Sequence, residues 1–327
     1  MRVARYRRYG PPDVVELADV GKPIPKHDEV LVRVHATTVC ATDAAIRRGD
    51  NGLLRLMLGI LKPRRPVVGG VEFSGQVVEV GAGVTRFQVG DLIFGIPGLQ
   101  GGAHAEYLCT PESGAIHIKP ANMSLEEAAC VACGGITALL FLRLANVTPG
   151  QEVLIYGASG AVGVFAVQLA KHSGARVTAV CSASNQDLVK SLGADAVVDY
   201  VTEDFAARGE VYDVVVDAVG KSGFARGVRA LKPGGAYVLI GGPYLPGPRR
   251  LWASLTGAAK VVGPFSSRSA ISSAGLAAEM AVLSQMIEAG ELRTIIGRSF
   301  PFAQIAEAHA YADSGHKVGN AVVVFER

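Results

Sequence analysis

The stretch that most constrains the fold of this chain is residues 151–200, in which a short apolar run leads into a glycine-rich turn. Residues 153–156, VLIY, show no alternation of polar and apolar side chains, which is typical of a strand buried on both faces. The turn GASGAVG at residues 157–163 is followed by apolar residues at helical spacing and by a second apolar strand at residues 176–181. The stretch therefore predicts a β-α-β unit, followed by a second helix and a third strand.

Glycines at a strand-to-helix turn let the backbone approach a pyrophosphate, and the helix N-terminus stabilises the phosphate charge. The spacing is G-x-x-G-x-x-G rather than the commoner G-x-G-x-x-G, and a glycine run alone also fits an ordinary loop. The flanking strands and helix supply the context that favours dinucleotide binding. At this turn we expect the cofactor to contact Ser159, Gly160, Ala161 and Val162.

The end of the second strand indicates which nicotinamide cofactor is bound. An NAD site carries Asp or Glu about 20 residues past the glycines, where the carboxylate binds the ribose 2′-hydroxyl. This chain has Ser182 and Asn185 in that region, and these side chains can donate hydrogen bonds to a 2′-phosphate that a carboxylate would repel. Tyr200 and Lys190 are further candidates for the same contact. The sequence therefore favours NADPH, although Asn185 could also cap the following helix.

Length and composition limit the classes of protein that the chain can represent. At 327 residues it is long for one hydrophobic core, so we expect two domains. Its 32 Lys and Arg against 29 Asp and Glu leave a net charge of +3, too small to favour nucleic acid or membrane partners. The five cysteines do not match a disulfide framework, and we find no signal-peptide pattern or membrane-length apolar run. We therefore expect a cytoplasmic protein.

The first 120 residues or so are rich in short strands and turns, which favours a compact β-barrel-like domain. Ser124, followed by Glu126 and Glu127, predicts the start of a helix. The clearest strands of the first domain are at residues 30–36, 72–81 and 89–94. Beyond residue 200 we expect strands at residues 213–220, 236–241 and 260–263, a helix at 277–288, and a tail strand at 319–325 that returns to the first domain.

In this order, the motifs resemble those of the medium-chain dehydrogenase/reductase superfamily, in its quinone oxidoreductase-like, zinc-independent branch. The resemblance covers nearly the whole chain, and a series of motifs in order is more specific than any one of them. The motifs are YGPPDVVEL at 9–17, DxxxRxG at 43–49, EFSGxV at 72–77, VGD at 89–91, GASGAVG at 157–163, LGAD at 192–195 and KxGN at 317–320.

The resemblance implies an α/β fold: a Rossmann doubly wound parallel sheet plus a GroES-like β-barrel catalytic domain, with the nicotinamide in a cleft between them. The expected domains are residues 1–122 with 267–327 (GroES-like) and 123–266 (Rossmann, binding NADP). Family members commonly pair as homodimers through the last Rossmann strand, here around residues 260–264. Small residues let the nicotinamide ring approach the backbone closely. The residues that we expect around the ring are Thr137, Ala218, Val219, Gly241 and Gly242, with Lys317 and Asn320 reaching in from the tail.

The zinc-dependent relatives bind catalytic zinc through the Cys of C-x-T-D, the His of G-H-E and a later Cys. This chain keeps Cys40 and Cys133, but Val71 stands where the His is expected. Because a catalytic zinc needs three protein ligands and an open position, we expect no metal ligands here, unless Glu72 takes the missing place. Cys130 and Cys133 form a C-x-x-C, but at no thioredoxin-like strand-helix junction, so we expect buried thiols.

Without a metal, hydride transfer from NADPH needs an electrophile that conjugation already polarises, such as a quinone or an α,β-unsaturated carbonyl. Thr42 matches the hydroxyl that relays protons in the zinc relatives, so it is the expected catalytic proton donor or orienter; the alternative is a structural hydroxyl. Asp43 and Arg47 are expected to form a structural ion pair, and His104 to border the cleft or to be structural.

The sequence therefore predicts an NADPH-dependent reductase of quinones, enones or related conjugated carbonyls. Two alternatives remain open at this point. One is a zinc-type alcohol dehydrogenase or carbonyl reductase. The other is a non-catalytic dinucleotide sensor, because a fold alone does not prove turnover.

Overall fold

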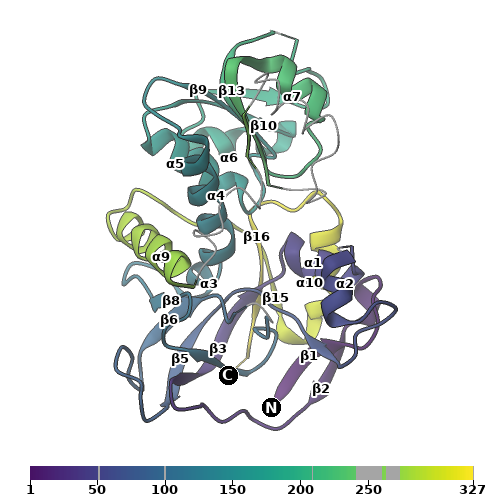
Figure 1. The fold of residues 1–327 in the computed structure, drawn as a ribbon, viewed down its shortest axis with the longest axis vertical. Helices are drawn as coiled ribbons and strands as arrows, with labels where there is room; N and C mark the ends of the chain where they lie inside the picture. Colours follow the sequence, from purple (N-terminus) through teal and green to yellow (C-terminus); the bar gives the residue numbers. More distant parts are fainter. Residues whose placement is uncertain (51, 99–100, 208, 241–259, 263–272, 327) are drawn as a thin grey trace. The chain divides into compact units, whose positions relative to one another are not determined.

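The computed structural model describes residues 1–50, 52–98, 101–207, 209–240, 260–262 and 273–326 (Figure 1). The chain divides into two compact units. The first unit is Met1–Cys133, Ser273–Glu288 and Thr294–Arg327, and the second is Gly134–Ser272 and Ala289–Arg293. This division differs from the expected domains because residues 123–133 belong to the first unit, and residues 267–272 and Ala289–Arg293 belong to the second.

The second unit is built on a six-stranded sheet in the order β11-β10-β9-β12-β13-β14, with every pair parallel. Its strands are β9 (Glu152–Tyr156), β10 (Arg176–Cys181), β11 (Ala196–Asp199), β12 (Tyr212–Asp217), β13 (Leu231–Leu239) and β14 (Lys260–Val262). Its helices are α5 (Gly163–His172), α6 (Gln186–Ser191) and α7 (Phe224–Ala230), together with most of α4 (Ala132–Ala145). The strand order reverses at β9, so right-handed crossovers place α5 and α6 on one face and α7 on the other.

This arrangement confirms the doubly wound parallel sheet that the sequence predicts. Val153, Leu154 and Ile155 of β9 are completely buried, as a central strand covered by helices on both faces requires. Residues 218–220 were expected in β12 but form a turn beyond it, because the Asp217 carboxylate accepts hydrogen bonds from the Val219 and Gly220 amides.

The first unit contains a seven-stranded mixed sheet in the order β15-β16-β3-β5-β6-β8, in which β7 also pairs with β3. These strands are β3 (Glu29–Thr38), β5 (Phe73–Val80), β6 (Leu92–Gly95), β7 (Tyr107–Pro111), β8 (Ile116–Ile118), β15 (Ile296–Pro301) and β16 (Asn320–Val324). A second sheet has the order β2-β1-β4, formed by β2 (Glu16–Asp19), β1 (Arg2–Tyr6) and β4 (Val67–Val68). The sequence places a strand start at Val89, but Gly90 has a φ of +103° and β6 begins only at Leu92.

The described part of the first unit also contains helices. They are α1 (Ala41–Arg48), α2 (Gly52–Leu58), α3 (Leu125–Ala128), α9 (Ser273–Glu288) and α10 (Ile305–Asp313), with short 3₁₀ turns at Pro12–Val14 and Phe302–Gln304. The expected helix start at Ser124 is confirmed, because its hydroxyl accepts from the Glu127 amide at 3.1 Å. None of the helices in the described part of the chain has the length and apolar character needed to cross a bilayer.

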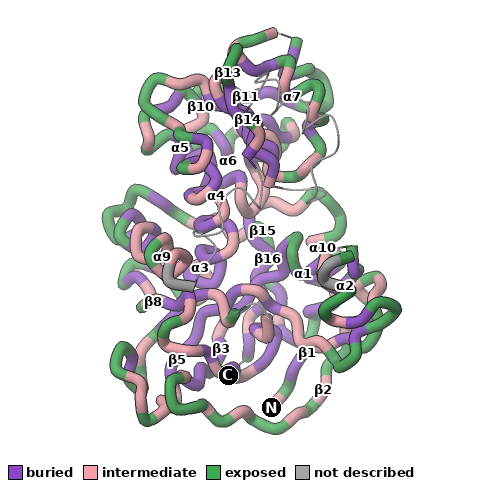
Figure 2. The backbone as a smooth tube through the Cα atoms, in the orientation of Figure 1, coloured by how far each residue is buried: buried purple, intermediate pink, exposed green. Residues whose placement is uncertain are grey.

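The tail strand β16 joins the first unit, as the sequence predicts. It lies between β3 and β15 (Figure 1), pairing antiparallel with β3 and parallel with β15. Val323 is opposite Thr37. Figure 2 shows β3, the strand at this centre, as mostly buried. Phe300, Phe302 and Phe325 from the C-terminal segment share one hydrophobic core with Val30 and Val32 of β3.

We expect Phe302→Ala to weaken the first unit and to leave the parallel sheet of the second unchanged. The Phe302 side chain is 1% exposed, and its ring stacks on Phe325 with centroids 4.3 Å apart. Truncating a buried Phe costs about 3–5 kcal/mol. Amide hydrogen exchange in β3 should therefore accelerate by roughly 100-fold or more, whereas exchange in β9 should not change.

The matched control for this variant is Leu61→Ala, because Leu61 is 90% exposed. Equal exchange rates in β3 for Phe302→Ala and Leu61→Ala would show that the C-terminal segment does not support the core of the first unit.

Candidate functional site

The three glycines of the turn in the second unit differ in what surrounds them. Gly157 has a φ of +81°, and a Cβ there would lie 2.8 Å from Val219 Cγ1. A Cβ at Gly163 would lie 2.2 Å from the Gly157 carbonyl oxygen, so the start of α5 packs directly on the turn. Gly160 differs, because an added Cβ would meet nothing closer than 3.4 Å. The packing of the chain therefore requires the first and third glycines, whereas the second leaves open backbone that a phosphate can approach.

A cluster of polar side chains lies just beyond the end of β10, beside this turn. Asn185 Nδ2 donates to Ser159 Oγ at 3.1 Å and to Ser182 Oγ at 3.0 Å. Ser182 Oγ also lies 3.1 Å from Ser184 Oγ. We call Ser159, Ser182, Ser184 and Asn185 the serine–asparagine cluster, and it contains no carboxylate. Asn185 occupies the position before α6, but its side chain makes no capping hydrogen bond and joins this cluster instead.

Tyr200 lies next to the serine–asparagine cluster in the sheet. It follows β11, whose Asp199 is paired in register with Cys181, and its amide donates to the Cys181 carbonyl at 3.4 Å. The Tyr200 side chain is 44% exposed, so its hydroxyl is available to a ligand. Lys190 is an exposed residue of α6.

Asp217 organises the carboxyl end of β12 and was not singled out from the sequence. Its carboxylate is buried and accepts hydrogen bonds from the Val219 and Gly220 amides, from the Ser222 amide and hydroxyl, and from the Tyr237 hydroxyl. These bonds fix the turn that holds Ala218 and Val219, two of the residues expected beside the nicotinamide. An Asp at the end of an apolar strand, three residues before a glycine, is the sequence signal that could have identified it.

The structure describes some of the other residues expected around the nicotinamide. Thr137 lies within α4. Gly241 and Gly242 lie outside the described residues. Asn320 opens β16 in the first unit, where its side chain is buried and donates to the Ile295 carbonyl at 3.2 Å. Asn320 is thus held by the protein itself, and any role toward the cofactor stays a prediction.

In the first unit, Glu72 is a completely buried carboxylate that contacts the end of β3 and the start of α4. One of its oxygens accepts a hydrogen bond from the Thr38 hydroxyl, and the other accepts from the Cys133 amide at 2.7 Å. Burial raises the pKa of Glu72 to about 7, although these two hydrogen bonds and the charge of Lys317 act in the opposite direction. Glu72 therefore changes its charge within the physiological range.

Lys317 is the cationic group of the same neighbourhood. Its ammonium donates to the Gly319 carbonyl at 2.7 Å. Burial lowers the pKa of Lys317, while the charges of Cys40, Glu72, Cys130 and Cys133 act to raise it. A partly buried lysine of this kind can donate a proton or stabilise a developing negative charge more readily than a solvated one.

Cys40 and Cys133, which match two zinc ligands of the zinc-dependent relatives, lie close together. The third ligand of those relatives, a His, is replaced by Val71. Cys40 Sγ and Cys133 Sγ are 3.9 Å apart. Both oxygens of Glu72 accept hydrogen bonds, from the Thr38 hydroxyl and the Cys133 amide, and the Val71 side chain has no ligand atom. Throughout the described residues, no three His, Cys, Asp or Glu side chains are grouped so as to hold a metal ion. The residues present therefore do not fit a catalytic zinc, which needs three protein ligands.

Thr42 is the second residue of α1 and is exposed, so its hydroxyl is available to a ligand. The expected ion pair between its neighbours Asp43 and Arg47 is wrong. Asp43 instead accepts from the Cys40 and Gly70 amides, each at 3.0 Å, and Arg47 pairs with Asp313. Asp313 is far from Arg47 in the sequence, and no local pattern connects them.

The remaining sequence candidates are structural. His104 is buried, with its ring nitrogen Nε2 3.0 Å from the Thr38 carbonyl and its ring edge-on to His309. The Cys130 thiol donates to the Glu126 carbonyl at 3.3 Å.

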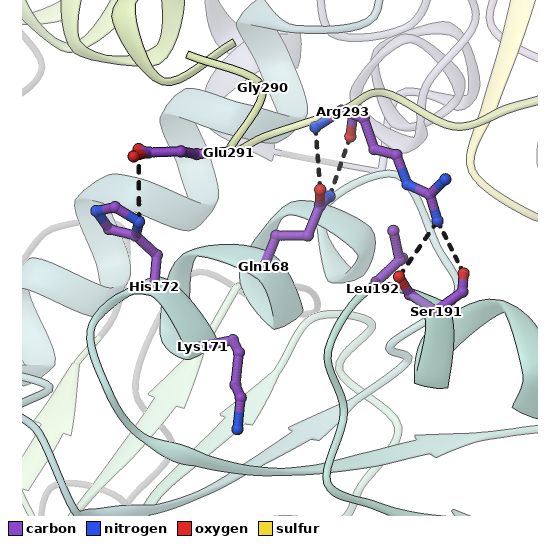
Figure 3. Close-up of a pocket in the computed structure, with 8 residues that line it drawn as sticks. All are labelled: Gln168, Lys171, His172, Ser191, Leu192, Gly290, Glu291 and Arg293. Carbon is purple, nitrogen blue, oxygen red and sulfur yellow. Dashed lines mark hydrogen bonds and ion pairs between the residues drawn. The ribbon is translucent and has the colours of Figure 1, made fainter.

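A cavity of about 350 Å³ beside α5 contains none of the predicted cofactor residues (Figure 3). The Gln168 side chain lines this cavity. It donates to the Arg293 carbonyl and accepts from the Arg293 amide, both at 3.0 Å. Arg293 also donates to Ser191 Oγ at 2.8 Å. The cavity thus lies where the segment Ala289–Arg293 is fastened to α5 and α6, and it is separate from the serine–asparagine cluster.

Known proteins resemble the chain along its whole length. A family model for the alcohol dehydrogenase GroES-like domain matches residues 26–120, and a zinc-binding dehydrogenase model matches residues 192–323. The chloroplast envelope quinone oxidoreductase homolog of Arabidopsis thaliana is 32% identical, over 99% of this chain and 98% of the relative. The NADPH-dependent alkenal/one oxidoreductase of the same plant is 31% identical, over 99% of this chain and 79% of the relative. The quinone oxidoreductase structure from Coxiella burnetii has a TM-score of 0.89 at 29% identity, covering 100% of this chain and 99% of that one.

We expect Glu72→Gln to remove a pH dependence of stability that the wild type shows between about pH 4.5 and 7. In that range the unfolded chain releases the Glu72 proton while the folded chain retains it, because the folded pKa is about 7. The free energy of unfolding of the wild type should therefore fall as pH rises, by on the order of 3 kcal/mol relative to the variant. Urea unfolding of both proteins at pH 5, 6, 7 and 8 measures this difference.

The control is Glu79→Gln in β5, the strand that begins directly after Glu72, because Glu79 is exposed. The pKa assigned to Glu72 is wrong if the stability difference between wild type and Glu72→Gln stays constant from pH 5 to pH 8.

Proposed function

Because the chain belongs to the medium-chain dehydrogenase/reductase superfamily, in its quinone oxidoreductase-like branch, we propose that it reduces quinones, enones or related conjugated carbonyls with NADPH and without catalytic zinc. That the chain is an oxidoreductase with a nicotinamide dinucleotide cofactor and a small-molecule substrate follows from its relatives. The observation that carries the choice of NADPH is the serine–asparagine cluster, with hydroxyls and an amide at the end of β10.

The second unit supplies the groups that would hold NADPH. The open backbone at Gly160, between Ser159 and Ala161, suits the pyrophosphate. Ser182 and Asn185 can donate hydrogen bonds to the 2′-phosphate, with Tyr200 at the same edge of the sheet. A carboxylate in the cluster would repel the 2′-phosphate, and the cluster has none. The name of the Arabidopsis alkenal/one oxidoreductase, which specifies NADPH, supports the same choice.

NADPH, when bound, supplies a hydride, and the residues of this chain must accommodate the charge that the substrate then develops. Conjugation spreads that charge onto a carbonyl oxygen, so a quinone or enone needs no metal to accept the hydride. The exposed Thr42 hydroxyl is our candidate to orient or protonate that oxygen. We assign Thr137, Ala218, Val219, Gly241, Gly242, Lys317 and Asn320 to the surroundings of the nicotinamide.

The proposed zinc independence depends on the hydrogen bonds of Glu72. Its two oxygens accept from Thr38 and Cys133, so these bonds already orient the carboxylate, and a metal bound by both oxygens would compete with them. The Cys40 thiol is buried, and its pKa is raised by its hydrogen bond to Cys133 and by burial. Zinc binds the thiolate form of cysteine, which this environment disfavours.

We also propose a homodimer formed through β14. This strand is at the end of the described strand order, so one of its edges can accept another strand. Residues 263–264 of the expected dimer contact lie outside the described residues. The expected cytoplasmic location stays a prediction, because the relatives include chloroplast proteins.

We expect the protein to bind NADPH more tightly than NADH, and Ser182→Asp to reverse this preference. An added carboxylate would repel the 2′-phosphate and accept hydrogen bonds from a free 2′-hydroxyl. Titration calorimetry with both cofactors should show the ratio of dissociation constants change by on the order of tenfold or more.

Thr148→Asp is the matched control, because it adds the same charge at an exposed position before β9, at the amino end of the parallel strands. Equal dissociation constants for the two cofactors in the unmodified protein would contradict the proposed selectivity.

We expect full activity after dialysis against a strong chelator, with less than one zinc per chain by elemental analysis. The assay is consumption of NADPH with a panel of quinones and enones. One tightly held zinc per chain, with activity lost on its removal, would show that Glu72 completes a metal site. Tight NADPH binding with no turnover on the whole panel would favour a dinucleotide sensor instead.

A further inference from the structure

Two thiols that are far apart in the sequence lie side by side in the first unit. Cys40 and Cys133 are 93 residues apart, and their sulfur atoms are 3.9 Å from each other, within the range of a thiol–thiol hydrogen bond. Cys40 follows β3 and immediately precedes α1, and Cys133 lies in the first turn of α4. The fold thus brings together a pair that neither the C-x-x-C motif nor the proposed reduction of carbonyls accounts for.

We propose that Cys40 and Cys133 are an oxidant-sensitive modification site, at which hydrogen peroxide produces a reversible intramolecular disulfide. A disulfide has an S–S distance of about 2.05 Å, so the two sulfurs must approach by about 1.9 Å. Rotation about the Cα–Cβ bond of either cysteine moves its sulfur without displacing the backbone.

The backbone on both sides of the pair is held in place. The Cys40 amide donates to the Asp43 carboxylate at 3.0 Å, and the Cys133 amide donates to Glu72 at 2.7 Å. Asp43 also accepts from the Gly70 amide at 3.0 Å, two residues before Glu72. Because these hydrogen bonds hold the backbone of both cysteines, the side chains can rotate while the two Cα atoms keep their positions.

The two thiols have different roles in the reaction because they differ in exposure. Cys133 is partly exposed, whereas Cys40 is only 6% exposed. Peroxide therefore reaches Cys133 first, converting its thiol to a sulfenic acid and releasing one water. The Cys40 sulfur then attacks the Cys133 sulfur, and the hydroxyl of the sulfenic acid leaves as a second water with the Cys40 proton.

The product links the β3–α1 junction to the start of α4. Thr42 lies two residues beyond Cys40, so the crosslink restrains the segment that carries the proposed proton donor. A dithiol reductant restores both thiols by exchange, which makes the modification reversible.

The experiment treats the full chain, first dialysed against a chelator, with hydrogen peroxide, and then alkylates the remaining thiols in denaturant. The number of alkylated cysteines should fall from five to three, that is five minus two, and return to five after dithiothreitol. Trypsin should yield the peptide 34–47, which contains Cys40, joined to the peptide 87–143, which contains Cys109, Cys130 and Cys133.

Variants identify the partner of Cys40 within the longer peptide. Cys40→Ser and Cys133→Ser should each abolish the crosslink, and the matched control Cys130→Ser should retain it. A crosslink that survives in Cys133→Ser overturns the proposal. So does treatment that leaves five alkylated cysteines, or that oxidises Cys133 to sulfinic acid without any crosslink to Cys40.

Discussion

The first unit depends on the hydrogen bonds of one strand, β3. This ten-residue strand pairs with β5, β7 and β16, which come from three separate parts of the chain. The approach of β5 is so close that a Cβ at Gly75 would lie 2.3 Å from the Arg33 carbonyl oxygen. The same strand ends at Thr38, whose hydroxyl bonds the buried Glu72, and leads two residues later to Cys40. The chemistry of the first unit is thus built directly on the end of its central strand.

The parallel sheet could be predicted from the sequence because its signals are local. Buried strands such as β9 are continuous apolar runs, and each is followed by a helix with its own spacing. The glycine turn is defined within seven residues, and only small residues allow α5 to pack on it at Gly163. The absence of a carboxylate near Ser182 was also visible locally, so the choice of NADPH could be argued from the sequence.

What the sequence could not predict are the contacts between residues that lie far apart along the chain. Arg47 finds its partner Asp313 at a separation of 266 residues, and a nearby carboxylate, Asp43, was the more obvious choice. Glu72 was considered only as a metal ligand, because no pattern shows that its oxygens face Thr38 and the Cys133 amide. Burial then sets its pKa, and burial depends on the complete tertiary structure.

The position of β16 between β15 and β3 also sets a time constraint on synthesis of the protein. A ribosome adds about 5–20 residues per second, so β3 waits on the order of 15–60 seconds for its last partner strand. During that interval residues 36–38 of β3 have an unpaired backbone edge, the kind of edge that associates with other nascent chains. The second unit, most of which is synthesised in between, can fold during the same interval. The protein therefore places a predictable demand on chaperones, and that demand grows as translation slows.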